Sequence, residues 1–270
     1  MPRIVNPFIT GNPVPPEKSI GRQREANTIL SLLAGPGRGS SAVSGEPRIG
    51  KTSLLHYIAE PSIAKKYGLT PDWCIFVDVN CQSVTPFTAT YFWQRAFRAM
   101  RKVADDELRK EIEQIWEQEE ITREDLEDFF DEIAAKQRLI VLVLDEFHAI
   151  IEGVSANVLL QFFNTLRTLI NRPSRGLALV VASREPLYEM CRGIRFAGSP
   201  FYNNFTFVHL KKFTREEAEE LIDKYLTGTG ITFDQEDREF LWQVSEAGHP
   251  YLLQVACFKL FEAKLSGKVP

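Results

Sequence analysis

Apolar side chains recur along this chain at two different periods. Between residues 22 and 33 they stand three or four residues apart, which predicts an amphipathic helix. Residues 139–144 and 177–182 are apolar throughout, which is typical of strands in a parallel sheet that is covered on both faces. The pattern therefore predicts an α/β protein with helices on both sides of a parallel sheet.

The same reading extends over the rest of the chain. Further strands are expected at 41–44, 73–79 and 205–210, which makes the sheet five-stranded. Further helices are expected at about 87–103, 107–118, 123–136, 235–245 and 250–264, and from Thr214 onward. Thr122 with Asp125, and Thr214 with Glu217, have the spacing of capping boxes. The expected architecture is a three-layer α/β domain followed by a helical subdomain.

Prolines set the expected domain boundaries. Five of them fall within residues 1–20, where they remove backbone donors and exclude a regular helix. Residues 1–20 are therefore expected to be an extended lead-in, with folded structure beginning near Gly21. We expect the sheet domain at 21–211 and a lid-like helical subdomain at 212–270.

Composition and charge exclude several classes of protein. The longest apolar runs are six residues, too short to cross a bilayer, and the four cysteines form no C-x-x-C pair. A reducing cytoplasm is therefore the expected location. The net charge is −4, with fourteen acidic against five basic residues in 104–138, which we read as a solvated helical face. No run of Lys and Arg suggests a nucleic-acid track, so nucleic acid is disfavoured as a partner.

The most specific motif lies between an expected strand and an expected helix. Residues 45–52 match G-x-x-x-x-G-K-[ST], the phosphate-binding P-loop or Walker A motif. Its backbone N–H groups and the following helix N-terminus suit a phosphate anion. We expect Lys51 to reach the β- and γ-phosphates and Thr52 to supply a hydroxyl ligand for Mg²⁺. The expected nucleotide contacts are Gly45, Glu46, Pro47, Arg48, Ile49, Gly50, Lys51, Thr52 and Ser53.

Two further strand ends carry charged residues. The strand at 139–144 runs into Asp145 and Glu146, at the edge where open α/β sheets bind ligands. Asp145 is expected to hold Mg²⁺, and Glu146 to orient or deprotonate the attacking water. Arg184 follows the strand at 177–182 and is expected to contact the γ-phosphate, with a surface ion pair to Glu185 as the alternative. His148 is read as a helix residue near the site.

These motifs together resemble a known group of proteins. The Walker A loop, the LIVLVLDE strand and the VVASR strand look like the ASCE division of P-loop NTPases. Within it, the chain is most similar to the STAND branch of signalling ATPases, which is allied to AAA+ proteins. Ile20, Gly21, Arg22 and Glu25 match the h-G-R-x-x-E entry motif, and Gly248, His249 and Pro250 match the G-x-P motif of the helical domain.

The resemblance carries its own expectations. It implies that Gly21 and Arg22 lie beside the adenine and that Pro250 packs on the base, while His249 is a residue of the helix entry. It implies an ATPase that binds ATP or ADP with Mg²⁺ and hydrolyses it slowly as a switch, with Lys51, Glu146 and Arg184 as catalytic residues. A nucleotide-dependent homo-oligomer and protein partners are also implied. The STAND histidine that touches the β-phosphate and the repeats that follow are not in this sequence.

Two other functions stay open at this point. One is an AAA+ or origin-recognition-type ATPase acting on DNA, which strong salt-sensitive DNA binding would distinguish from a signalling switch. The other is a non-catalytic nucleotide-binding module, which would keep Lys51 and make no use of Glu146.

Overall fold

The computed structural model describes residues 4–116, 118 and 120–267, and its centre is a five-stranded parallel sheet. The strands lie in the order β2-β3-β4-β1-β5. Their bounds are Ser40–Ser44 (β1), Cys74–Asn80 (β2), Leu139–Asp145 (β3), Leu177–Ser183 (β4) and Phe205–His209 (β5). All five expected strands are present, each within one or two residues of its expected ends.

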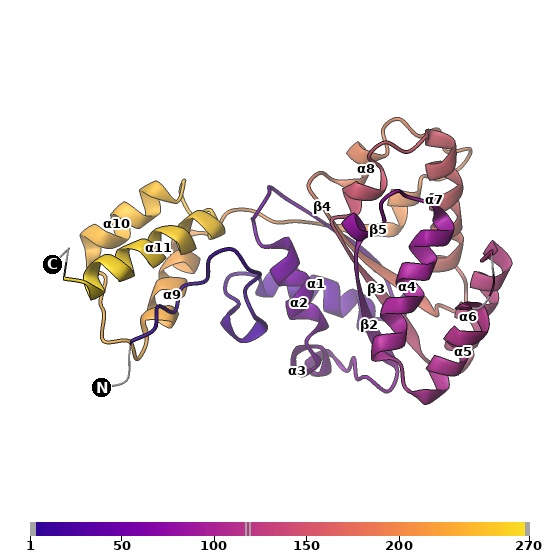
Figure 1. Cartoon of the computed structure of the whole chain (residues 1–270), viewed down its shortest axis with the longest axis horizontal. Helices are drawn as coiled ribbons and strands as arrows, with labels where there is room; N and C mark the ends of the chain where they lie inside the picture. Colours follow the sequence, from indigo (N-terminus) through magenta and orange to yellow (C-terminus); the bar gives the residue numbers. More distant parts are fainter. Residues whose placement is uncertain (1–3, 117, 119, 268–270) are drawn as a thin grey trace.

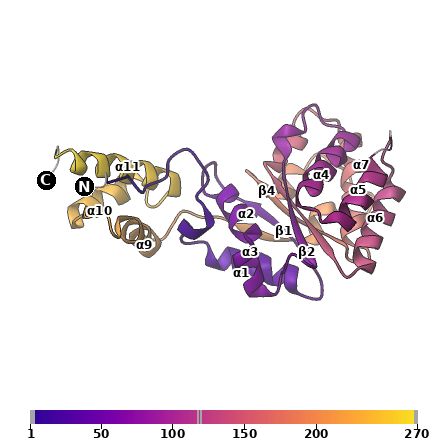
Figure 2. The same ribbon diagram turned by 60° about the horizontal axis from the view of Figure 1, so that its bottom comes forward.

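Alternate residues of the central strands face two separate cores. On β3, Leu139, Val141 and Val143 pack with the side chains of α1 (Gln23–Ala34) and α2 (Lys51–Ala59). Ile140, Leu142 and Leu144 face the other core, under the helices that cover the opposite face of the sheet. Figure 2 shows the sheet between these two groups of helices. Both faces are covered, which is why the strands are apolar throughout.

The second face carries most of the helices. They are α4 (Ala89–Val103), α5 (Asp106–Trp116), α6 (Arg123–Ala135) and α7 (Ala156–Ile170), with the short α3 (Pro61–Ala64) and α8 (Leu187–Met190) elsewhere on the domain. Helix α7 is absent from the expected elements. Its signal is nevertheless in the sequence, because its buried residues recur at three- and four-residue intervals: Leu159, Phe162, Phe163, Leu166 and Leu169.

The C-terminal helices form a third core of their own. They are α9 (Arg215–Leu226), α10 (Gln235–Val244) and α11 (Pro250–Leu265), and Figure 1 shows them set apart from the sheet and its helices. The capping boxes at Thr122 and Thr214 are present as expected. The three-layer α/β fold with a C-terminal helical part is therefore confirmed.

The N-terminal segment is not an unpacked lead-in. Phe8 is 4% exposed and stacks on Tyr225 and Phe233 among the C-terminal helices. Asn6 donates to the carbonyl oxygen of Phe258, and Figure 1 shows the segment passing from these helices towards α2. The expectation that folded structure begins near Gly21 is wrong, because apolar side chains before it complete the third core. We call residues 6–20 the N-terminal strap.

No helix in the described ranges is long and apolar enough to cross a membrane. The four cysteines are buried and unpaired.

Candidate functional site

The P-loop joins β1 to α2 through backbone that glycine favours. Gly45 has φ +156°, and a Cβ there would lie 2.9 Å from the carbonyl oxygen of Leu210. Gly50, with φ +104°, caps α2 in the left-handed conformation, so Lys51 is the first residue of the helix. The motif therefore adopts the strand-loop-helix context that phosphate binding requires.

Lys51 is buried, and its ammonium is held by its own loop. Nζ donates to the carbonyl oxygens of Gly45 at 2.8 Å and Glu46 at 2.9 Å. Burial lowers the pKa of Lys51, while the nearby carboxylates of Glu146 and Asp145 act in the opposite direction and Arg184 adds to the lowering. An anionic ligand in this place would therefore relieve an unfavourable burial of charge.

Thr52 of α2 and Asp145 at the carboxyl end of β3 are hydrogen-bonded to each other. The Thr52 hydroxyl donates to Oδ2 of Asp145 at 2.7 Å, and Oδ1 of the same carboxylate accepts from the backbone N–H of Glu146 at 2.9 Å. A hydroxyl and a carboxylate are hard oxygen donors, which suit Mg²⁺. No group of three or more His, Cys, Asp or Glu side chains in the described part of the chain is placed to hold a metal. Magnesium at this pair would therefore take its other ligands from phosphate and water.

Glu146 contacts a residue that the sequence did not assign to it. Its Oε2 lies 3.1 Å from Nε2 of His148, and its backbone is in the left-handed region with φ +52°. A non-glycine residue in that region is strained, and such strain is common at functional sites. His148 lies in a short 3-10 turn after β3, as expected of a residue near the site, and its side chain packs against Glu146.

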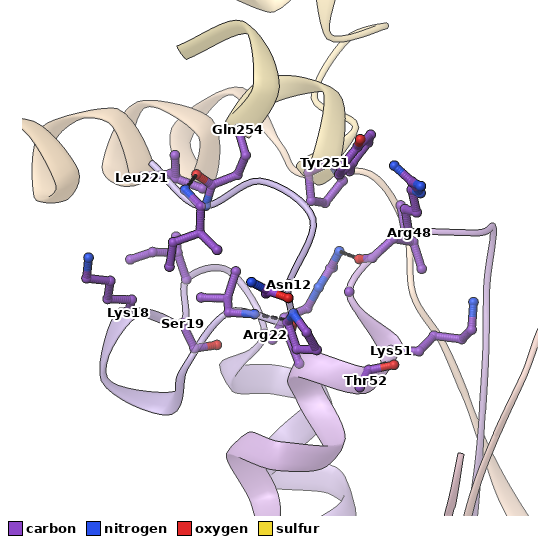
Figure 3. Close-up of a pocket in the computed structure, with 18 of the residues that line it drawn as sticks. Asn12, Lys18, Ser19, Arg22, Arg48, Lys51, Thr52, Leu221, Tyr251 and Gln254 are labelled. Atoms are coloured by element: carbon purple, nitrogen blue, oxygen red, sulfur yellow. Dashed lines mark hydrogen bonds between the residues drawn. The ribbon is translucent and has the colours of Figure 1, made fainter. Parts of the chain in front are cut away.

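A cavity of about 290 Å³ runs from the P-loop to the C-terminal helices (Figure 3). Of the expected site residues, those on its wall are the nucleotide contacts Arg22, Arg48, Ile49, Gly50, Lys51, Thr52, Ser53 and Pro250, and the catalytic residue Glu146. The side chains of Glu46 and Pro47 are exposed, and neither they nor Gly45, Gly21 and Asp145 line the cavity. Gly21 packs instead against the Phe213 ring, where a Cβ would lie 2.9 Å from Cε1.

Arg22 is buried at the junction of the two parts of the chain. Its Nη2 donates to the carbonyl oxygens of Ile49 at 3.0 Å and Lys211 at 2.8 Å, and its guanidinium lies 4.9 Å from the centre of the Phe213 ring. Burial lowers the pKa of Arg22. Its donors at Nη2 are therefore used to join the P-loop to the linker before α9.

Arg184 stands at the carboxyl end of β4 and is exposed. It does not line the cavity, and it makes no ion pair with Glu185 or any other carboxylate that the structure describes. The hydroxyl of Ser183 donates to the carbonyl oxygen of Glu185 instead. The surface-pair alternative is therefore absent, and the guanidinium stays available to a ligand.

Among the wall residues that the sequence did not indicate are Ile9, Val14, Tyr251 and Gln254. The guanidinium of Arg48 lies 4.2 Å from the centre of the Tyr251 ring, so a P-loop side chain touches α11, and Figure 3 shows the two together on one side of the cavity. Gln254 of α11 accepts from the backbone N–H of Ile9 at 3.0 Å, and Ser53 of α2 accepts from that of Val14 at 3.0 Å. The strap is therefore held to both sides of the cavity.

Residues 18–181 match a family model that describes an AAA ATPase domain. The chain belongs to the AAA ATPase domain family. This confirms the expected P-loop ATPase and a nucleotide as its ligand. No relative is found among the curated proteins.

Solved structures show the same fold at low identity. An ORC2 protein of Aeropyrum pernix, in its ADPNP-ADP complexes, matches with a TM-score of 0.65 and 16% identity over 95% of this chain and 66% of that one. A Walker-type ATPase of Pyrococcus abyssi matches with a TM-score of 0.64 and 13% identity over 97% of this chain and 78% of that one. A Drosophila ORC structure bound to DNA matches with a TM-score of 0.62 and 18% identity over 95% of this chain and 59% of that one. The chain thus spans 66% and 59% of the length of these two ORC chains, just under two thirds at most.

Proposed function

We propose that this AAA ATPase domain binds ATP with Mg²⁺ in the cavity between the P-loop and the C-terminal helices. It hydrolyses the ATP slowly and acts as a switch of the STAND signalling type. The observation that carries the proposal is that one cavity wall combines Lys51, Thr52 and Glu146 with Pro250 of α11. Residues suited to bind phosphate, to bind metal and to act as a base thereby line the same cavity as the C-terminal helices.

Lys51 and the Thr52–Asp145 pair are the phosphate and metal ends of this proposal. Phosphate oxygens would replace the two carbonyls that now accept from Lys51, so that the acceptor as well as the donor of each hydrogen bond would carry charge. Thr52 and Asp145 would hold Mg²⁺, which supplies charge neutralisation to the phosphates when bound. Glu146 would orient the attacking water and accept its proton.

The switch rests on contacts that cross the cavity. Arg48 reaches Tyr251, Arg22 joins Ile49 to Lys211, and the strap contacts both Ser53 and Gln254. A nucleotide in the cavity would touch every one of these segments. On this basis we propose 21–211 as the nucleotide-binding domain and 212–270 as its lid. Arg22 and Pro250 would lie beside the adenine base of the nucleotide.

A second candidate function is an ATPase of the origin-recognition type that acts on DNA. What supports it is the likeness of the fold to ORC structures, one of them bound to DNA. Electrophoretic mobility measurements with duplex DNA at rising salt distinguish the two. Affinity that falls steeply with salt would favour the second candidate, and no binding at about 0.1 M salt would favour the switch.

The test of the proposal is Glu146→Gln, since an amide keeps the shape of the side chain and cannot accept the proton. We expect this variant to bind ATP as the parent does, with single-turnover hydrolysis at least about 100-fold slower, the lower range for general-base catalysis. The matched control is Glu152→Gln, which removes an exposed carboxylate on the same segment. Parental hydrolysis by Glu146→Gln would refute its role as base and favour a non-catalytic module.

A further inference from the structure

Gln254 of α11 is the most deeply buried polar side chain on the wall of the cavity of about 290 Å³, which we call the nucleotide cavity. It is 3% exposed, against 6% for both Arg22 and Lys51. Those two cations donate hydrogen bonds to backbone carbonyl oxygens. Gln254 stands four residues after Pro250, so the two residues share one face of α11.

Only one end of the Gln254 amide has a partner. Its Oε1 accepts from the backbone N–H of Ile9 at 3.0 Å, whereas Nε2 is buried and has no hydrogen-bond partner among the described residues. Because the N–H of Ile9 can only donate, this bond fixes which end of the amide is the oxygen. The other end is therefore an N–H donor group without an acceptor, which is unfavourable and rare in a protein interior.

The neighbouring Tyr225 hydroxyl does not satisfy this amide. Burial raises the pKa of the hydroxyl and the Gln254 amide acts in the opposite direction, so the two groups lie near each other. The hydroxyl donates its own proton to the carbonyl oxygen of Lys18 at 3.2 Å. The two hydrogens of an amide nitrogen point in different directions, so one hydroxyl could accept only one of them. A donor of Nε2 is thus left for a ligand.

The end of the nucleotide cavity near Gln254 is suited to a flat apolar group. Figure 3 shows Gln254 and Leu221 at the other end of the cavity from Lys51. Five apolar wall residues belong to the core of the C-terminal helices: Ile9, Ile20, Phe213, Leu221 and Tyr225. A nucleotide with its phosphates at the P-loop would place its base at this end. The ring nitrogens of a base are the acceptors that Nε2 lacks.

We propose that Gln254 selects the base of the nucleotide by donating a hydrogen bond from Nε2 to one ring nitrogen of adenine. The Ile9 N–H holds Oε1, so the amide does not turn over to accept from the base. A base that presents an N–H at this place would face a second donor and is rejected. The strap thereby takes part in base selection. This inference rests on the proposed nucleotide site.

Analogues of ADP that lack one ring nitrogen test this hydrogen bond without changing the protein. The ring nitrogens of adenine that can accept are N1, N3 and N7, and 1-deaza-ADP, 3-deaza-ADP and 7-deaza-ADP each carry a C–H group in place of one of them. Calorimetric titration with Mg²⁺ compares each with ADP. We expect wild type to bind one analogue at least about fivefold more weakly, the lower range for leaving a buried donor unpaired, and the others as it binds ADP.

Gln254→Met assigns the effect to the amide, because methionine fills a similar space and has no N–H donor. In this variant the sensitive analogue should bind as ADP does. Loosening of the strap through the lost Ile9 contact would weaken all four ligands alike, so it leaves their ratios unchanged. The matched control is Gln243→Met, which removes an exposed amide of α10 and should keep the wild-type ratios. Circular dichroism melting confirms that each variant is folded.

Two outcomes would overturn the role of Gln254 and leave the nucleotide site in place. If all three analogues bind wild type as ADP does, no ring nitrogen is recognised and Gln254 only holds the strap. If the sensitive analogue stays weaker in Gln254→Met, another group donates to that nitrogen. Wild-type protein that binds no ADP at all would refute the proposed nucleotide site together with this inference.

Discussion

The P-loop surrounds the ammonium group of Lys51. This ammonium is buried, the pKa of Lys51 is lowered by that burial, and two carbonyl oxygens of the loop accept its hydrogen bonds. These neutral acceptors satisfy two of its three donors without neutralising its charge. A phosphate would do both, so the structure of the loop itself favours an anionic ligand at this place.

Arg184 is the residue that we expect to distinguish ATP from ADP. Its backbone follows buried β4, and its guanidinium has no carboxylate partner among the described residues. If it contacts only the γ-phosphate, Arg184→Ala weakens binding of a non-hydrolysable ATP analogue by about 1.5–3 kcal/mol, the range for a hydrogen bond to a charged group. Binding of ADP should stay nearly unchanged in calorimetric titration with Mg²⁺.

The control for this comparison is Arg192→Ala, which removes an exposed arginine that pairs with Glu189. Equal weakening of both ligands by Arg184→Ala would mean that Arg184 supports the diphosphate or the fold. Unchanged binding of both would remove it from the site.

At the scale of elements, the turn into α11 fixes how the C-terminal helices meet the linker. Gly248 has φ +94°, its carbonyl oxygen accepts from the N–H of Phe213 at 2.8 Å, and a Cβ would lie 2.4 Å from the Phe213 oxygen and 2.8 Å from Trp242. The glycine of the G-x-P motif is thus required by close packing as well as by its dihedral angle. Pro250 then begins α11 without the loss of a helical donor.

Gly248→Ala should therefore destabilise the protein by more than the usual cost of a left-handed alanine. That cost is about 1–2 kcal/mol, and the overlap with Phe213 and Trp242 adds about 1–3 kcal/mol. Gly228→Ala is the matched control, because its φ is +79° and nothing lies within 4 Å of the added Cβ. Urea unfolding measures both, and equal losses would show that the packing at Gly248 contributes nothing.

The strands of the sheet domain, and its longer helices other than α7, were predicted because each is coded locally. Walker A and the acidic pair after β3 are each a continuous stretch of sequence. Strands that are apolar throughout indicate burial on both faces of the sheet. The strap could not be predicted in the same way. Phe8 and Val14 reach their partners, Tyr225 and Ser53, only after folding, and prolines signal an extended backbone without indicating what it packs on. The Arg48–Tyr251 contact is non-local for the same reason.

At the scale of the whole molecule, the nucleotide cavity is where the sheet, the strap and the C-terminal helices meet. Its wall takes residues from the P-loop, from β3's end at Glu146, from the strap and from α9 and α11. A ligand that contacts all of these stabilises the folded chain as a unit, by an amount that grows with its concentration over its dissociation constant. A nucleotide bound in this cavity would therefore contact the C-terminal helices as well as the P-loop.

The measurement that tests the central claim most directly is calorimetric titration of ATP and ADP with Mg²⁺ into wild-type protein and Lys51→Ala. The account predicts that wild type binds both nucleotides and that Lys51→Ala binds them at least tenfold more weakly, as expected for lost hydrogen bonds from a charged donor. Lys224→Ala, which removes an exposed lysine of α9, should bind as wild type does. Equal affinity of wild type and Lys51→Ala, or no binding by wild type, would contradict the account.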